Sequence, residues 1–133
     1  MSNLQIWIDA LRSGKYQQVD GHLAAHIVND EVGYCCLGVA CHLFDPEYNI
    51  LNIKSCAVTT KTANALSEIA IYGQNDPAEY WGSTEITINE ILAMANDRGF
   101  TFAQIADALE EYRNDPRIDV LKNWFIDHDP EGV

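Results

Sequence analysis

The chain has 133 residues, of which 47% are hydrophobic, and it carries a net charge of −12 at neutral pH. This length and composition suit one α+β domain, residues 1–133, that buries its own core without disulfide or metal support. The acidic excess argues against nucleic acid as a direct ligand, because phosphate binding requires clustered lysine and arginine. No run of about 18 apolar residues occurs, so we expect no membrane association and a cytoplasmic, unprocessed protein.

The first predicted helix covers residues 3–13, with Ser2 or Asn3 as its cap and Gly14 just past its end. Four apolar side chains recur at helical spacing and would share one buried face: Leu4, Trp7, Ile8 and Leu11. A small N-terminal β-hairpin should follow.

Residues 16–19 and 22–28 have the composition of the two hairpin strands, and Asp20-Gly21 favours the turn between them. The sequence NDEVG at 29–33 is typical of a tight connection to the next element.

Residues 34–44 read YCCLGVACHLF and contain three of the four cysteines. We expect a helix over 35–44, ended by Asp45-Pro46, because a proline disfavours helical backbone in the residue before it. Gly38 would allow a neighbouring element to approach closely. The apolar residues share one face, so this helix should belong to the core: Leu37, Ala40, Cys41 and Phe44.

The rest of the chain is expected to be mainly helical. A helix over 60–71 should end at Gly73, and a long connection over 73–85 contains Tyr80 and Trp81. Two capping boxes, Thr87 with Glu90 and Thr101 with Gln104, predict helices over 88–98 and 102–113. Asp115-Pro116 predicts the cap and first residue of a last helix to about 126, with three residues turned inward: Ile118, Leu121 and Phe125.

Cys35 and Cys36 are candidate catalytic nucleophiles, because a cysteine in the first turn of a helix lies where the helix dipole stabilises a thiolate. Such a thiol also needs a base. None of the four histidines lies in a convincing strand after this helix: His22, His26, His42 and His128. The cysteines are therefore better explained as buried, reduced core residues.

No cofactor or metal is expected from the sequence. The chain has no CxxC pair, Cys41 and His42 are neighbours that would point in different directions, and no glycine-rich phosphate-binding loop occurs.

The order of motifs resembles a group of small uncharacterised proteins from bacteriophages and prophages. The matching segments are LxSGxYxQ at residues 11–18, YCCLGV at 34–39 and NDxGxxFxxIA at 96–106. This resemblance implies an accessory phage protein expressed in the bacterial host cytosol, and it carries over no established activity.

Proteins of that kind often act by binding, which leads to our functional expectation: inhibition or sequestration of a host or defence factor without catalysis. The alternative is a cysteine-dependent hydrolase or transferase. Residues 1–66 have a net charge of −2 and residues 67–133 of −10. A host protein with a basic surface would therefore meet four expected contact residues: Tyr80, Trp81, Glu110 and Glu111.

Two further interpretations remain open. The ligand could instead be a small anion such as a nucleotide signal, for which the N-terminal half offers four cations: Arg12, Lys15, Lys54 and Lys61. The acidity could also serve only to keep the protein soluble. The sequence does not exclude a homo-oligomer.

Overall fold

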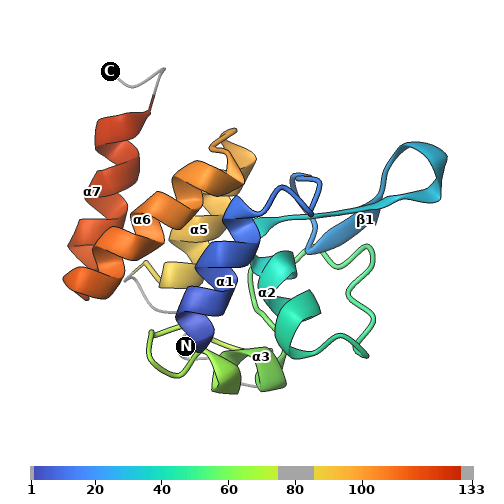
Figure 1. Cartoon of the computed structure of the whole chain (residues 1–133), viewed down its shortest axis with the longest axis horizontal. Coiled ribbons are helices and arrows are strands. Elements are labelled where there is room, and N and C mark those ends of the chain that lie inside the picture. Colours follow the sequence, from blue (N-terminus) through green and yellow to red (C-terminus); the bar gives the residue numbers. More distant parts are fainter. Residues whose placement is uncertain (1, 75–85, 130–133) are drawn as a thin grey trace.

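The computed structural model describes residues 2–74 and 86–129 and shows a mainly helical α+β fold (Figure 1). The predicted fold class is confirmed. In chain order the described elements are α1 (Asn3–Arg12), β1 (Ala24–His26), the 3-10 turn η1 (Val28–Asp30), β2 (Val32–Tyr34), α2 (Cys36–Phe44), α3 (Thr60–Ala65), α5 (Ile88–Asp97), α6 (Phe102–Asn114) and α7 (Ile118–His128).

Helix α2 is the centre of the molecule and contacts α1, α3, α5 and β2. Its residues from Cys36 to Cys41 are all buried, as its composition predicts. Trp7 of α1 is also fully buried, and its indole Nε1 donates a hydrogen bond of 3.0 Å to the carbonyl oxygen of Cys36. The buried indole therefore keeps its polar group satisfied while it packs against α2.

Gly38 brings the backbone before β1 directly onto α2. A Cβ atom at Gly38 would lie only 1.7 Å from the carbonyl oxygen of Leu23. Leu23 is fully buried, and its carbonyl accepts a hydrogen bond of 3.2 Å from the Cys35 amide. The expected close approach at this glycine is thus confirmed.

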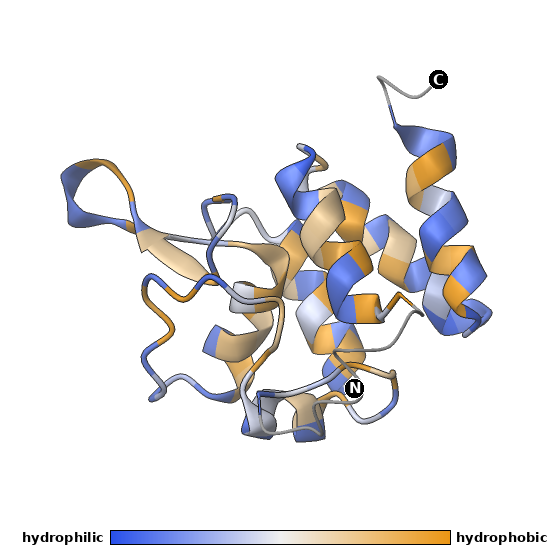
Figure 2. Cartoon of the chain, turned by 180° about the vertical axis from the view of Figure 1, so that it is seen from behind, coloured by the Kyte–Doolittle hydropathy of each residue, from blue (hydrophilic) through white to orange (hydrophobic). Residues whose placement is uncertain are grey.

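The C-terminal helices pack beside α1. Helix α6 contacts both α1 and α7, and α5 contacts α2, α6 and α7. Figure 1 shows α6 between α1 and α7, and Figure 2 shows hydrophilic and hydrophobic residues alternating along these helices, as amphipathic helices require. Both predicted capping boxes are present, at Thr87 with Glu90 and at Thr101 with Gln104.

One hairpin strand lies where it was expected, because β1 falls within residues 22–28, and the other strand does not. β1 pairs antiparallel with β2, so residues 32–34 form a strand that the NDEVG composition concealed, whereas residues 16–19 form no strand. Asn29 and Asp30, with φ of 62° and 63°, form the tight turn between the strands. Positive φ at two consecutive turn residues matches the twist of a hairpin. Figure 1 shows this hairpin projecting from the helices.

Two helix predictions were wrong at one end. α3 stops at Ala65, since Val58 pairs with residues 72–74 through hydrogen bonds to Tyr72 and Gln74, which a helix to 71 would prevent. α7 starts at Ile118 because the Asp115 carboxylate binds the Arg117 side chain at 2.9 Å instead of capping the helix. Ile118, expected to face inward, is 37% exposed.

Candidate functional site

Three motif segments that are distant in the sequence meet at the beginning of α2. Asn96 of α5 is fully buried, and its Oδ1 accepts hydrogen bonds from the Cys36 amide at 3.1 Å and from Gln18 Nε2 at 2.9 Å. Its Nδ2 donates to the Val19 carbonyl at 2.8 Å. A single buried amide thereby holds the segment after α1, the start of α2 and the end of α5 together.

A hollow of about 240 Å³ opens beside this junction, and we call it the thiol hollow. Asp97, next to Asn96, lies on its rim and accepts a hydrogen bond of 2.9 Å from the Gly21 amide. The residues that line the hollow come from four segments: Gly21, His22, Cys35, Leu37, Lys54, Ser55, Cys56, Ala93 and Asp97.

Cys35 occupies the N-cap position of α2, where its sulfur accepts a hydrogen bond of 3.3 Å from the Gly38 amide. Burial nevertheless raises the pKa of the Cys35 thiol to about 12, because desolvation outweighs the stabilising amides of Gly38 and Leu37. Cys36 is completely buried, and burial raises its pKa well above the ordinary value. Both thiols are therefore protonated at neutral pH, which does not suit a nucleophile.

The structure places His22 in the same hollow as Cys35, which the sequence analysis missed. No motif spacing indicates this neighbourhood, because the hairpin and the Asn96 junction create it. The ring nitrogen Nδ1 of His22 hydrogen-bonds the carbonyl of Asp20 at 3.3 Å, so this nitrogen is directed to the backbone. Cys56, which also lines the hollow, is only partly buried.

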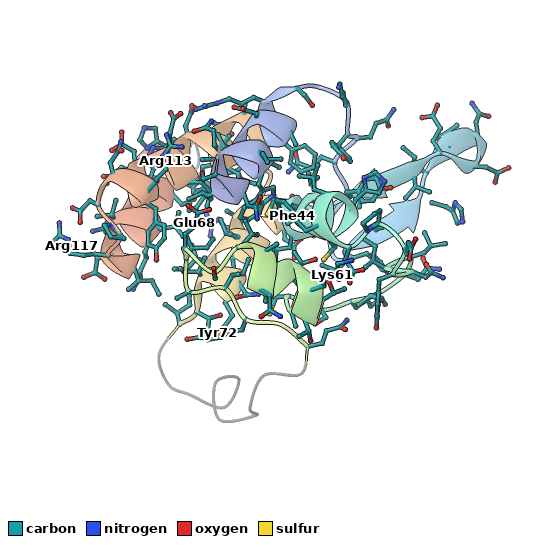
Figure 3. The ribbon with its side chains drawn as sticks, turned by 60° about the horizontal axis from the view of Figure 1, so that its bottom comes forward. Phe44, Lys61, Glu68, Tyr72, Arg113 and Arg117 are labelled. Atoms are coloured by element: carbon teal, nitrogen blue, oxygen red, sulfur yellow. The ribbon has the colours of Figure 1, made fainter. Side chains whose placement is uncertain are left out.

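The four cations expected to bind a small anion are dispersed. Arg12 is bound to Asp107 and Glu110 of α6, and its Nη1 lies 2.9 Å from Glu110 Oε1. Lys54 lines the thiol hollow, whose lining also includes Asp97. Lys15 is exposed just after α1, and Lys61 is exposed on α3, where Figure 3 shows it apart from Arg113.

The expected contact residues of the acidic half are only partly described. Tyr80 and Trp81 lie outside the described residues. Glu110 is held by Arg12, and this guanidinium keeps the pKa of Glu110 below its ordinary value. The neighbouring Glu111 is exposed to solvent on α6.

Every arginine of the chain is paired with a carboxylate of its own fold. In addition to Arg12, the pairs join Arg98 with Asp129, Arg113 with Glu110, and Arg117 with Asp115. Figure 3 shows Arg113 and Arg117 on the same side of the molecule. The positive charge of the arginines is therefore compensated within the chain, and the lysines are the cations that an anionic ligand could meet.

A second hollow, of about 330 Å³, lies at the base of the hairpin, and we call it the tyrosine hollow. Tyr34 of β2 and His42 of α2 line it, and their ring centroids are 5.3 Å apart. The hydroxyl of Tyr16, which is not among the lining residues, forms a hydrogen bond of 2.9 Å with Nδ1 of His42.

Residues 2–74 and 86–129 contain neither a metal-binding cluster nor a membrane-spanning helix. No three histidine, cysteine or acidic side chains are grouped so that they could hold a metal ion. None of the helices in these ranges combines the length and apolar character needed to cross a membrane.

Comparison with known proteins gives one match. Residues 3–113 match the family described as Domain of unknown function (DUF8296). The chain belongs to this family. The matched region ends within α6, so α7 lies beyond it. No curated protein and no solved structure matches the chain.

Proposed function

We propose that this protein acts by binding, without catalysis, and that its partner is a host protein with a basic surface. In this proposal the protein is a phage accessory factor that inhibits or sequesters a component of the bacterial host or of its defence. The motif resemblance supports the phage setting. The distribution of charge supports the choice of a basic partner.

The observation that carries the proposal is the pairing of all four arginines with carboxylates of the same chain. After this pairing, the exposed surface of α6 and α7 keeps further carboxylates, among them Glu111, Asp119 and Asp127. Such an excess attracts a basic surface and accelerates its association. A small anion in the thiol hollow would instead meet a lining that contains the carboxylate of Asp97 as well as Lys54.

The proposal is tested by pull-down of the tagged full-length protein from host lysate. We expect one host protein that is retained at low salt and released at high salt, because screening weakens exposed charge pairs. Glu111→Lys should weaken the interaction by about twofold to fivefold, as expected for one exposed charge pair. Asp9→Lys on α1 is the matched control, since it makes the same change of charge in the less acidic half of the chain.

Two results would contradict the proposal. The first is retention of the host protein that does not depend on salt, and the second is equal weakening by Glu111→Lys and Asp9→Lys. Either result would mean that the acidic surface of α6 and α7 does not bind the partner. Recovery of a bound nucleotide without any host protein would indicate that this protein binds a small anionic ligand instead.

The enzymatic alternative has one observation in its favour, because the thiol hollow contains Cys35, His22 and Asp97 together. It requires a reactive thiol. Rapid labelling of Cys35 by iodoacetamide near neutral pH would support this alternative. We expect slow labelling, because the thiol is buried and its pKa is raised.

A further inference from the structure

The tyrosine hollow lies between the hairpin, the C-terminal end of α2 and the loop over 46–51. Its volume of about 330 Å³ is close to the lower limit of ligand sites, roughly 300 Å³. It therefore suits one side chain or a small group better than a folded element. Tyr34, His42, Glu47 and Tyr48 are among the residues that line it.

The aromatic part of this hollow is held in place by its own contacts. Tyr16 packs edge-on against Tyr34 with a centroid distance of 5.3 Å, and it contacts His42 in the same way at 5.5 Å. The hydrogen bond from Tyr16 to His42 adds a polar constraint. Tyr48 also lines the hollow and is 46% exposed. A ligand would thus meet the rings of Tyr34 and His42, whose positions are largely fixed before binding, and the exposed ring of Tyr48.

The charge of the hollow selects between ligand classes. Glu47 is an acidic lining residue, and the lining contains neither lysine nor arginine. The thiol hollow differs because it contains Lys54, and the groove between α5 and α7 differs because it contains Arg98 and Lys122. Aromatic rings together with a carboxylate favour a cation over an anion.

We propose that the tyrosine hollow binds an arginine side chain of the partner protein. A guanidinium is planar, stacks on aromatic rings and donates paired hydrogen bonds to a carboxylate, which Glu47 can accept. This inference rests on the proposed function in one respect, since it takes the partner to be a basic protein. It adds a specific pocket to the general attraction of the acidic surface.

The test uses three capped pentapeptides of glycine with one central arginine, lysine or glutamate, titrated into the 15N-labelled full-length protein. We expect the arginine peptide to shift the amide signals of Tyr34, His42 and Tyr48. The lysine peptide should bind more weakly, and the glutamate peptide should produce no shift at these residues. Tyr48→Ala and Glu47→Gln should each weaken arginine binding by about threefold to tenfold, whereas Tyr48→Phe should retain it.

Unchanged amide dispersion elsewhere in the spectrum verifies that each variant is folded. The inference is overturned if arginine binding is insensitive to both Tyr48→Ala and Glu47→Gln, or if the lysine or glutamate peptide binds as tightly. Pull-down distinguishes the two proposals. A basic partner that is bound more weakly by Glu111→Lys but as strongly by Tyr48→Ala would leave the proposed function standing and remove the arginine pocket. Binding of the arginine peptide, with no basic protein recovered in the pull-down, would leave the pocket standing and remove the proposed function.

Discussion

At Gly38 the packing of α2 leaves no room for a methyl group. The Leu23 carbonyl occupies the place of a Cβ atom, and both residues are buried. Because this carbonyl also accepts the Cys35 amide, it cannot move without breaking a buried hydrogen bond. The close contact therefore has a measurable consequence for stability.

We expect Gly38→Ala to lower the free energy of unfolding by about 2 to 4 kcal/mol, as forced overpacking and a strained buried hydrogen bond would. Gly14→Ala is the matched control, because Gly14 has a φ of 75° and no atom within 4 Å of a Cβ. The control changes only backbone preference, and it should lower the free energy of unfolding by about 1 kcal/mol because a residue with a Cβ atom is disfavoured at positive φ. Urea unfolding of both variants measures the difference, and equal losses would refute the steric explanation.

The buried thiols predict how stability responds to alkali. Burial raises the pKa of Cys35 to about 12 in the folded state, whereas the pKa of an unfolded thiol is its ordinary value of 9.0. Between these values the unfolded chain releases a proton that the folded chain retains, so the free energy of unfolding falls as pH rises from about 9 to about 12. Below the lower value this contribution is constant.

Urea unfolding at a series of alkaline pH values tests this expectation. The decline with pH should be shallower in Cys35→Ala, which lacks one of the buried thiols, although Cys36 and Tyr112 also have raised pKa values and still contribute. An identical decline in both proteins would mean that the Cys35 thiol is already ionised or accessible in the folded state.

At the scale of elements, local signals predicted best where the elements depend on local interactions. The capping threonines Thr87 and Thr101 satisfy amides three residues away, so the sequence identifies both helix beginnings. The hairpin depends on longer-range contacts. Tyr34 of β2 forms backbone hydrogen bonds with Gln17 and Val19, and Ala24 of β1 forms a β-bridge with Leu51. No local sequence pattern indicates these contacts.

The same reason explains which parts of the candidate sites escaped prediction. Cys35 was recognisable from its place at a helix beginning, but its neighbours in the thiol hollow come from separate segments. Likewise, Tyr34 and Tyr48 share the tyrosine hollow only because α2 and the following loop fold back beside the hairpin. Charge and composition alone bring no such distant segments together, so they could not indicate the pocket.

Helix α7 lies beyond the family match but packs into the common core. Leu121 is fully buried, Phe125 is nearly so, and the Phe125 ring meets Phe100 edge-on at 5.0 Å. We expect Leu121→Ala to lower the free energy of unfolding by about 2 to 5 kcal/mol through loss of buried surface and cavity formation. The exposed neighbour Asn123→Ala should change it by less than about 0.5 kcal/mol.

Chemical unfolding monitored by tryptophan fluorescence would measure both variants. If Leu121→Ala behaves like Asn123→Ala, α7 is an independent appendage rather than part of the domain core. A large difference would establish that the stable unit extends past residue 113, where the family match ends.

At the scale of the whole molecule, two electrostatic effects oppose each other. The net charge of −12 means that acidic side chains repel one another in the folded state, which destabilises it. Exposed ion pairs, such as Arg117 with Asp115, stabilise it by attraction. An exposed pair contributes only about 0.2 to 1 kcal/mol, and salt screens both effects. The sign of the salt dependence therefore shows which effect is larger.

We expect the thermal unfolding midpoint to rise when NaCl is increased to about 0.5 M, where the screening length falls below about 8 Å. Self-repulsion should prevail because the acidic residues number 20 against eight basic ones, so most carboxylates have no cation to pair with. The rise should be smaller in Glu111→Lys, which is less negative. A midpoint that falls with salt would contradict this expectation. It would mean that the attraction within the arginine–carboxylate pairs stabilises the fold by more than the repulsion among unpaired carboxylates destabilises it.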